Sequence, residues 1–269
     1  MSAALQMPLS ELLWWLASAA MLATFAVMWA VSLVDRRVLD GANVWAKPMK
    51  FAVSVSMHLA TLALVAHFLS PDWSRGVLLC VLAIASVAAA IGEVGYIAFQ
   101  AARLQASHFN VGTPFHAAMY ALMAFGAVVL VVASGGVGVA AAVDAQSALS
   151  APVRLAVSTG LIAGTVLTLI TAFRLGGNMS HHVGIEPEGA LRMPITGWSL
   201  TVGDLRPAHF LATHMMQAVP IFGVIAAWLL PAAAAVIAVL VVAAAWILAT
   251  FALFSIGVAG RPFTALIGR

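Results

Sequence analysis

The stretch AAAAVIAVLVVAAAWILATFALFSIG, residues 232–257, decides the fold, because it carries no charged side chain over its whole length. A helix needs about 20 consecutive apolar residues to cross the hydrocarbon core of a bilayer. The rest of the chain has the same character: 64% of the 269 residues are hydrophobic, 8% are charged, and the mean hydropathy is +1.07. Soluble domains carry about 25% charged residues. The sequence therefore predicts an integral membrane protein.

Six further apolar runs of similar length fill most of the chain. Together with the first they predict an all-α fold, a seven-transmembrane-helix bundle that forms a single membrane domain over residues 1–269. The predicted helices are about 10–33, 51–69, 76–102, 116–138, 153–174, 208–229 and 232–257. The connection 175–206 is longer than an ordinary connector and contains Gly, Pro and Trp, so we expect a folded cytoplasmic loop or lid there.

The basic residues are distributed unevenly between the two sides of such a bundle. If the N-terminus lies outside, only Arg75 and Arg154 of the 12 Lys and Arg residues fall in outer segments. This positive-inside bias predicts an outer N-terminus, a cytoplasmic C-terminus and a multi-pass protein of the cell inner (cytoplasmic) membrane. The net charge of +3 then reflects membrane topology, so we expect a lipid bilayer and no nucleic acid as partner. The single Cys80 excludes an intrachain disulfide and a cysteine-based metal cluster.

Polar side chains form a stripe along each of four predicted helices. At 100° per residue, each stripe covers an arc of about 80° to 140°. Because a polar side chain that faces lipid costs several kcal/mol, we expect the stripes to face one another inside the bundle. In chain order they contain Lys50, Ser54, His58 and Thr61; Glu93, Tyr96, Gln100 and Arg103; Thr168, Thr171, Arg174 and Asn178; and Arg206, His209, Thr213, His214 and Gln217.

Depth singles out three of these residues. His58, Glu93 and His214 each lie about 10 Å from the expected cytoplasmic end of their helix, at 1.5 Å per residue. We therefore expect them to meet in one plane of a polar cavity that opens to the cytoplasm. The approach to this cavity would be lined by Arg206, His209 and His116. Spacing within one helix does not establish contact between helices, so the prediction requires the stripes to converge.

Two imidazoles and a carboxylate fit several chemistries. His58, Glu93 and His214 can bind Zn²⁺ with an open position for water, or non-haem Fe²⁺ with positions open for oxygen. His58 and His214 can instead be the axial ligands of haem b, with arginines pairing its propionates. A Glu/His chain can also relay protons in a transporter. The remaining alternative is that these groups only hydrogen-bond neighbouring helices.

The leading hypothesis is a metal- or haem-dependent membrane enzyme, an oxidoreductase that acts on a lipid-soluble substrate or quinone. The alternatives are a proton-coupled transporter or channel that uses the same residues, and a non-catalytic scaffold or assembly factor. The candidate catalytic residues are Glu93, Tyr96, Arg103, Arg174 and Arg206, and the candidate cofactor ligands are His58, His116, His209 and His214.

Overall fold

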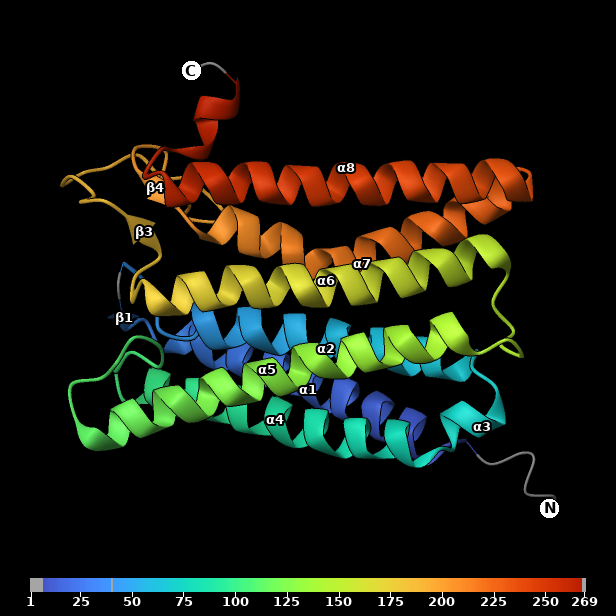
Figure 1. Ribbon diagram of the computed structural model, residues 1–269. Helices are drawn as coiled ribbons and strands as arrows, with labels where there is room; N and C mark the ends of the chain where they lie inside the picture. The colour runs from blue at the N-terminus through green and yellow to red at the C-terminus, as the bar shows by residue number, and fades with distance from the viewer. Residues whose placement is uncertain (1–6, 40, 268–269) are drawn as a thin grey trace. The chain divides into compact units, whose positions relative to one another are not determined.

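The computed structural model describes residues 7–39 and 41–267. Within this part of the chain, seven helices are long and apolar enough to cross a membrane (Figure 1). They are α1 (Leu9–Val34), α2 (Ala46–His67), α4 (Val77–Ala102), α5 (Pro114–Val143), α6 (Ala151–Gly177), α7 (Arg206–Leu229) and α8 (Ala232–Val258). The short elements are β1 (Val38–Leu39), β2 (Ala42–Asn43), α3 (Pro71–Ser74), β3 (His182–Val183), β4 (Gly203–Asp204) and the 3₁₀ helix η2 (Phe263–Ile267).

Each apolar run of the sequence corresponds to one of these seven helices, and three helices, α2, α5 and α6, are clearly longer than expected. α6 extends from Ala151 to Gly177 instead of about 153–174. α2 begins at Ala46 instead of about 51, because Pro48 lies in the first turn, where a missing backbone N–H is tolerated. α5 continues to Val143 instead of about 138, through a glycine- and alanine-rich stretch. In lipid the backbone must satisfy its own hydrogen bonds, so glycine does not end a helix there.

The chain divides into two compact units, Met1–Leu149 and Ser150–Arg269, and each is described by itself. In the first unit, α1 packs against α2 and α4, and α5 packs against α4 and α2. Small polar side chains join these helices: the Trp14 indole donates to Ser86 Oγ at 2.9 Å, and Ser18 Oγ donates to the Ser56 carbonyl at 2.8 Å. In a membrane, where no water is available, hydrogen bonds of this kind satisfy the polar groups of neighbouring helices.

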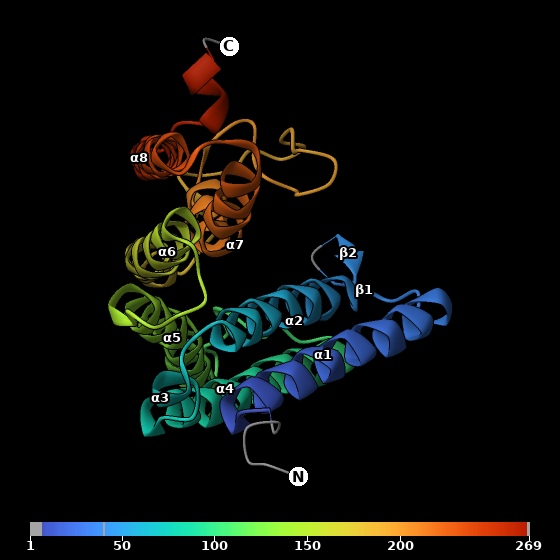
Figure 2. The same cartoon turned by 90° about the vertical axis from the view of Figure 1, so that its right-hand side faces the viewer.

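In the second unit, α6 packs most extensively against α7, and both pack against α8 (Figure 2). Two glycines, Gly160 and Gly164, lie one turn apart on the side of α6 that meets α7. A Cβ at Gly160 would lie 2.7 Å from Pro220 Cδ, and one at Gly164 would lie 2.7 Å from Met216 Cγ. The two helices approach this closely because these residues have no side chain.

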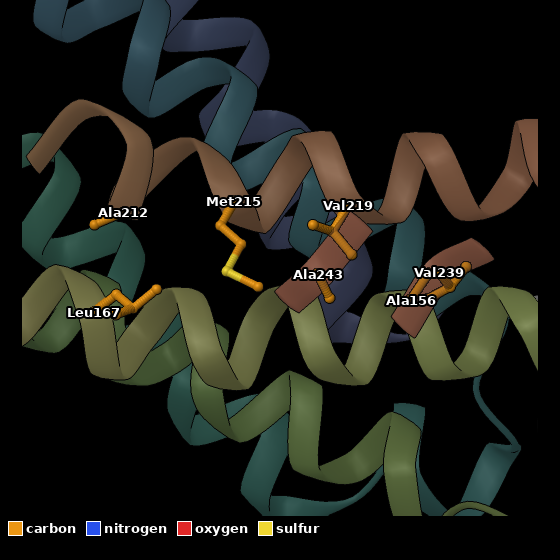
Figure 3. Packing of buried hydrophobic residues seen from close by; sticks show 7 residues of the cluster. All are labelled: Ala156, Leu167, Ala212, Met215, Val219, Val239 and Ala243. Carbon is orange, nitrogen blue, oxygen red and sulfur yellow. The ribbon is translucent and has the colours of Figure 1, made fainter. Parts of the chain in front are cut away.

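The core of the second unit lies between its three helices and is shown in Figure 3. It is built from small and flexible side chains, which fit the narrow space between closely packed helices. α7 bends in its middle part (Figure 1), where Pro220 removes one backbone hydrogen bond. The buried members of the cluster are Ala156, Leu167, Ala212, Met215, Val219, Val239 and Ala243.

The long connection between α6 and α7 is folded. Its two ends pair as the antiparallel strands β3 and β4, with His182 opposite Asp204 and Val183 opposite Gly203. The Gly203 amide also donates to the Gly260 carbonyl, just beyond α8, at 2.9 Å. The connection is therefore held at the end of the second unit where α7 begins and α8 ends.

Candidate functional site

The residues singled out by the sequence are divided between the two units. The first unit contains His58, Glu93, Tyr96, Arg103 and His116, and the second contains Arg174, Arg206, His209 and His214. The structure describes the surroundings of each residue within its own unit. The expected meeting of His58, Glu93 and His214 therefore stays a prediction.

Glu93 lies on α4, roughly 13 Å from the end of that helix at 1.5 Å per residue, and is 5% exposed. Its carboxylate lies beside Gly126 of α5, where an added Cβ would come within 2.8 Å of Glu93 Oε1. The glycine therefore makes room for the carboxylate. Oε1 is buried and has no hydrogen-bond partner among the described residues. This is unusual, because buried polar groups are nearly always hydrogen-bonded.

Two further polar groups belong to the same part of the first unit. The Tyr96 hydroxyl, one turn along α4 from Glu93, is also buried and without a hydrogen-bond partner in the described part of the chain. Lys47, at the exposed start of α2, interacts electrostatically with Glu93. We refer to Lys47, Glu93 and Tyr96 together as the Glu93 site. It combines an acid, a phenol and an ammonium group.

Aromatic rings lie at the same end of α2 and α5. His108, in the connection between α4 and α5, is 5.5 Å from the Phe51 ring and 6.4 Å from the Tyr120 ring, measured between centroids. Phe109 is 5.8 Å from Tyr120 and adopts a left-handed backbone conformation with φ of 57°. Non-glycine residues adopt this conformation only when their surroundings hold them there. These four residues form what we call the ring cluster.

His58 is held by α5. Its Nε2 lies 3.2 Å from the Leu130 carbonyl oxygen and 3.1 Å from Ser134 Oγ. Gly126, Leu130 and Ser134 follow one another at intervals of four residues and so share one face of α5. Glu93 and His58 therefore approach the same face of this helix, at neighbouring turns.

Arg103 and His116 each make a contact close by in the chain. The Arg103 guanidinium lies 5.2 Å above the centre of the Phe99 ring. His116 takes part in the N-cap of α5: its backbone N–H donates to Thr113 Oγ1 at 3.2 Å, and its Nδ1 lies 2.9 Å from the same oxygen. The charge of Arg103 also acts on Tyr96 of the Glu93 site, whereas the contacts of His116 do not involve that site.

In the second unit, His209 is held by α6. Its Nδ1 lies 3.0 Å from Thr171 Oγ1, which is also within hydrogen-bond distance of the Leu167 carbonyl oxygen at 2.9 Å. His214 interacts electrostatically with His209 and lies 4.2 Å from the Phe210 ring, measured between centroids. Arg174 Nη1 lies 3.5 Å from Asn178 Oδ1.

Arg206 is part of a saturated ion pair with Asp204. Its backbone N–H and Nε each donate to Asp204 Oδ1 at 2.9 Å, and its Nη2 donates to Oδ2 at 2.6 Å. The Ser199 amide donates to Oδ2 at 2.8 Å, and the Asp204 side chain is 0% exposed. Burial raises the pKa of Asp204, but the hydrogen bonds and charge of Arg206 outweigh it and hold the pKa below its usual value. We call this pair the buried clip.

The first unit contains the same arrangement between Asp35 and Arg37. The Arg37 backbone N–H and Nε donate to Asp35 Oδ1 at 3.2 and 2.9 Å, and Nη2 donates to Oδ2 at 2.7 Å. The Trp45 indole donates to Oδ2 at 2.9 Å. Hydrogen bonds from Arg37, followed by that from Trp45, hold the pKa of Asp35 well below its usual value. The Arg37 side chain is 44% exposed, so we call this pair the exposed clip.

A second layer of charge surrounds the buried clip. Arg206 Nη2 lies 3.2 Å from His182 Nε2, which accepts because a guanidinium only donates. His182 Nδ1 lies 3.4 Å from Glu186 Oε2, which also pairs with Arg192 at 2.5 Å. His182 therefore connects Arg206 to Glu186, which in turn pairs with Arg192. Arg206 therefore stabilises the connection between α6 and α7.

The sequence stripes contained Glu93, Tyr96 and Arg206 but omitted Lys47, the ring cluster and the other residues of the two clips. Two signals in the sequence point to these groups. Lys47 and Phe51 are four residues apart, which places them on one face of α2. The pattern Asp-x-Arg occurs at 35–37 and again at 204–206, each time close to the end of a long helix.

Comparison with known proteins finds no family model, no curated protein and no solved structure that matches this chain. Among the described residues, no three His, Cys, Asp or Glu side chains lie together in a group that could hold a metal ion. Proposals about function therefore rest on the geometry of the two units.

Proposed function

We propose that the protein is a proton-coupled membrane transporter in which Glu93 takes up and releases the coupled proton. The supporting observation is that Glu93 Oε1 is buried in a membrane-spanning helix without a hydrogen-bond partner in the described residues. Burying an unpaired carboxylate costs several kcal/mol, and a proton or a ligand group removes that cost. Carboxylates in such positions commonly mark proton and substrate pathways.

The orientation follows from the same proposal. The excess of Lys and Arg in alternate connections supports an outer N-terminus and a cytoplasmic C-terminus in the cell inner membrane. Lys47 and the connection after α4 then lie on the cytoplasmic side, so the Glu93 site exchanges protons with the cytoplasm. Cysteine labelling from each side of intact cells and inverted vesicles, with single cysteines in the connections after α4 and after α5, tests this orientation.

The transport proposal is tested with the full chain in liposomes that contain a pH-sensitive dye. Panels of cationic, zwitterionic and anionic small metabolites are added, and a coupled substrate changes the internal pH. We expect Glu93→Gln to abolish this signal and Glu93→Asp to retain part of it. Glu188→Gln, which changes an exposed carboxylate of the second unit, is the matched control.

Infrared titration supplies a readout that needs no substrate. A carboxyl that exchanges a proton in the membrane gives a carboxylic-acid C=O band that changes with pH and is missing in Glu93→Gln. Absence of such a band from the wild-type protein, together with no solute-driven proton movement, would overturn the proposal.

A second candidate function is supported by the two histidines of α7. His209 Nδ1 is within hydrogen-bond distance of Thr171 Oγ1, and metal-ligating histidines commonly have one ring nitrogen held in this way while the other binds the metal. His214 is close enough to interact with it electrostatically. This supports the cofactor-dependent oxidoreductase with a lipid-soluble substrate or quinone. Either of two observations would favour it over transport: a haem Soret band in the absorption spectrum, or about one Zn or Fe per chain by elemental analysis. The signal should be lost in both His209→Ala and His214→Ala.

A further inference from the structure

We propose that the first unit binds an anionic phospholipid where α1 and α4 end, with the lipid phosphate held by Arg36 and Arg103. This inference is independent of the proposed function, because it requires neither Glu93 nor the movement of a proton. Three observations carry it. The two helix ends are joined, their arginines have open hydrogen-bond donors, and apolar side chains lie exposed deeper on both helices.

The exposed clip joins the two helix ends. Asp35 directly follows α1, and Arg37, which pairs with it, also donates from Nη1 to the carbonyl oxygen of Ala102 at 3.0 Å. Ala102 is the last residue of α4, and Arg103 comes next. Arg36 and Arg103 are therefore the chain neighbours of the two residues that make this contact.

Both of these arginines have donors available. Arg36 and Arg103 are exposed, and neither side chain forms a hydrogen bond or an ion pair with another described residue. The guanidinium of Arg103 lies above the Phe99 ring and its charge acts on Tyr96, but neither interaction uses its N–H groups. A guanidinium has five such donors in a planar arrangement that fits the oxygens of a phosphate.

The charge around the ends of α1, α2 and α4 is positive. The acids of this region are Asp35, which pairs with Arg37, Glu93, which is buried, and Asp40, which lies outside the described residues. The basic residues outnumber these acids even when all three acids are ionised, so an anion is attracted here. They are Arg36, Arg37, Lys47, Lys50 and Arg103.

Apolar side chains lie deeper on the same two helices. On α1, Trp29 and Leu33 are 54% and 50% exposed, and on α4, Phe99 is 50% exposed one turn before Arg103. Each helix thus presents apolar groups first and cations at its end. A phospholipid has the same order, with acyl chains in the hydrocarbon and a phosphate at its surface. This match favours a lipid over a free phosphate or an acidic protein, because neither of these requires the apolar surface.

The test is native mass spectrometry of the full chain in a neutral detergent. The probe is dioleoylphosphatidylglycerol, and dioleoylphosphatidylcholine is the zwitterionic lipid with the same chains. We expect the anionic lipid to be retained at concentrations at least about tenfold lower than the zwitterionic one. Arg36→Gln and Arg103→Gln should each weaken its retention by about fivefold, the contribution typical of one basic residue near a membrane surface.

Arg261→Gln is the matched control, because it removes an exposed arginine that follows α8 in the second unit. We expect this variant to retain the anionic lipid as the wild type does, and an excess of inorganic phosphate to leave the lipid bound. Melting temperatures without lipid show that each variant is folded, since neither Arg36 nor Arg103 has a hydrogen bond to lose.

Three outcomes would overturn the inference. Equal retention of the two lipids would mean that only the apolar surface binds them, and displacement by inorganic phosphate would indicate a site for free anions. A loss in Arg261→Gln as large as that in Arg36→Gln would mean that charge acts without a defined site. Each of these outcomes leaves the proposal of proton transport through Glu93 unaffected.

Discussion

The exposed clip and the buried clip use the same hydrogen-bond pattern in different surroundings. In both, an arginine two residues after an aspartate donates its backbone N–H and its side chain to that carboxylate. The Asp35 and Arg37 side chains are 16% and 44% exposed, whereas those of Asp204 and Arg206 are 0% and 26% exposed, and Asp204 receives the Ser199 amide as well. We therefore expect the same pattern to contribute more to stability in the buried clip, since water screens the more exposed pair more strongly.

Glu93 differs from Asp204 in its hydrogen bonding. It is nearly as buried as Asp204, yet one of its oxygens has no hydrogen-bond partner in the described residues. A carboxylate whose oxygens are all hydrogen-bonded stabilises the fold, whereas one with an oxygen that lacks a partner is open to a proton or ligand. The comparison separates a structural acid from a candidate functional one.

The largest effect is expected from removal of the buried acid. Asp204→Ala leaves the Arg206 guanidinium and the Ser199 amide without their acceptor, and we expect it to destabilise the second unit by about 3–5 kcal/mol. Hydrogen exchange of peptides from β3, β4 and the start of α7 measures the loss. Asp72→Ala, at an exposed position in α3, is the control, and equal protection in both variants would contradict the structural role of the clip.

The second prediction concerns the loss of stability at low pH. The pKa of Asp204 is lower in the folded state than in the unfolded chain, so its contribution to stability is complete above the unfolded value of about 3.9 and is lost as pH falls below it. We expect protection of the second unit near β4 to decrease as pH is lowered through this range. Asp204→Asn should already be less protected at neutral pH and should lose this part of the acid dependence.

The exposed clip should give a smaller effect. We expect Asp35→Ala to lower the melting temperature much less than Asp204→Ala, because the partly exposed Arg37 regains water when it loses its partner. Added salt should reduce the difference between Asp35→Ala and wild type further. A loss as large as that of Asp204→Ala would show that exposure does not distinguish the two clips.

The smallest change in stability is expected at Glu93. Because Glu93 Oε1 has no partner to lose, we expect Glu93→Gln to leave the melting temperature unchanged or slightly raised, while the infrared proton signal disappears. Thermal unfolding of the purified protein measures the first quantity. A decrease comparable to that of Asp204→Ala would mean that Glu93 has a structural role.

Part of the candidate site could be predicted from the sequence. The stripe on α4 identified Glu93 and Tyr96, because helical periodicity determines which residues share a face. Helical periodicity did not identify the role of Arg206. Its angular position places it in the stripe on α7, but its side chain is bound by Asp204, which lies just before that helix. Nor did it indicate that His58 would contact the Leu130 carbonyl, since periodicity says which face a residue lies on and not which helix covers it.

The amino-acid sequence alone accounts for the seven helices that are long and apolar enough to span a membrane. Helix formation in lipid depends on local composition and length, because every backbone polar group must be satisfied within its own segment. Which buried polar side chains have hydrogen-bond partners, and which lack them, depends on the tertiary structure. That difference depends on neighbours distant in the chain, such as Gly126 beside Glu93, and on the close approach of helices within each unit.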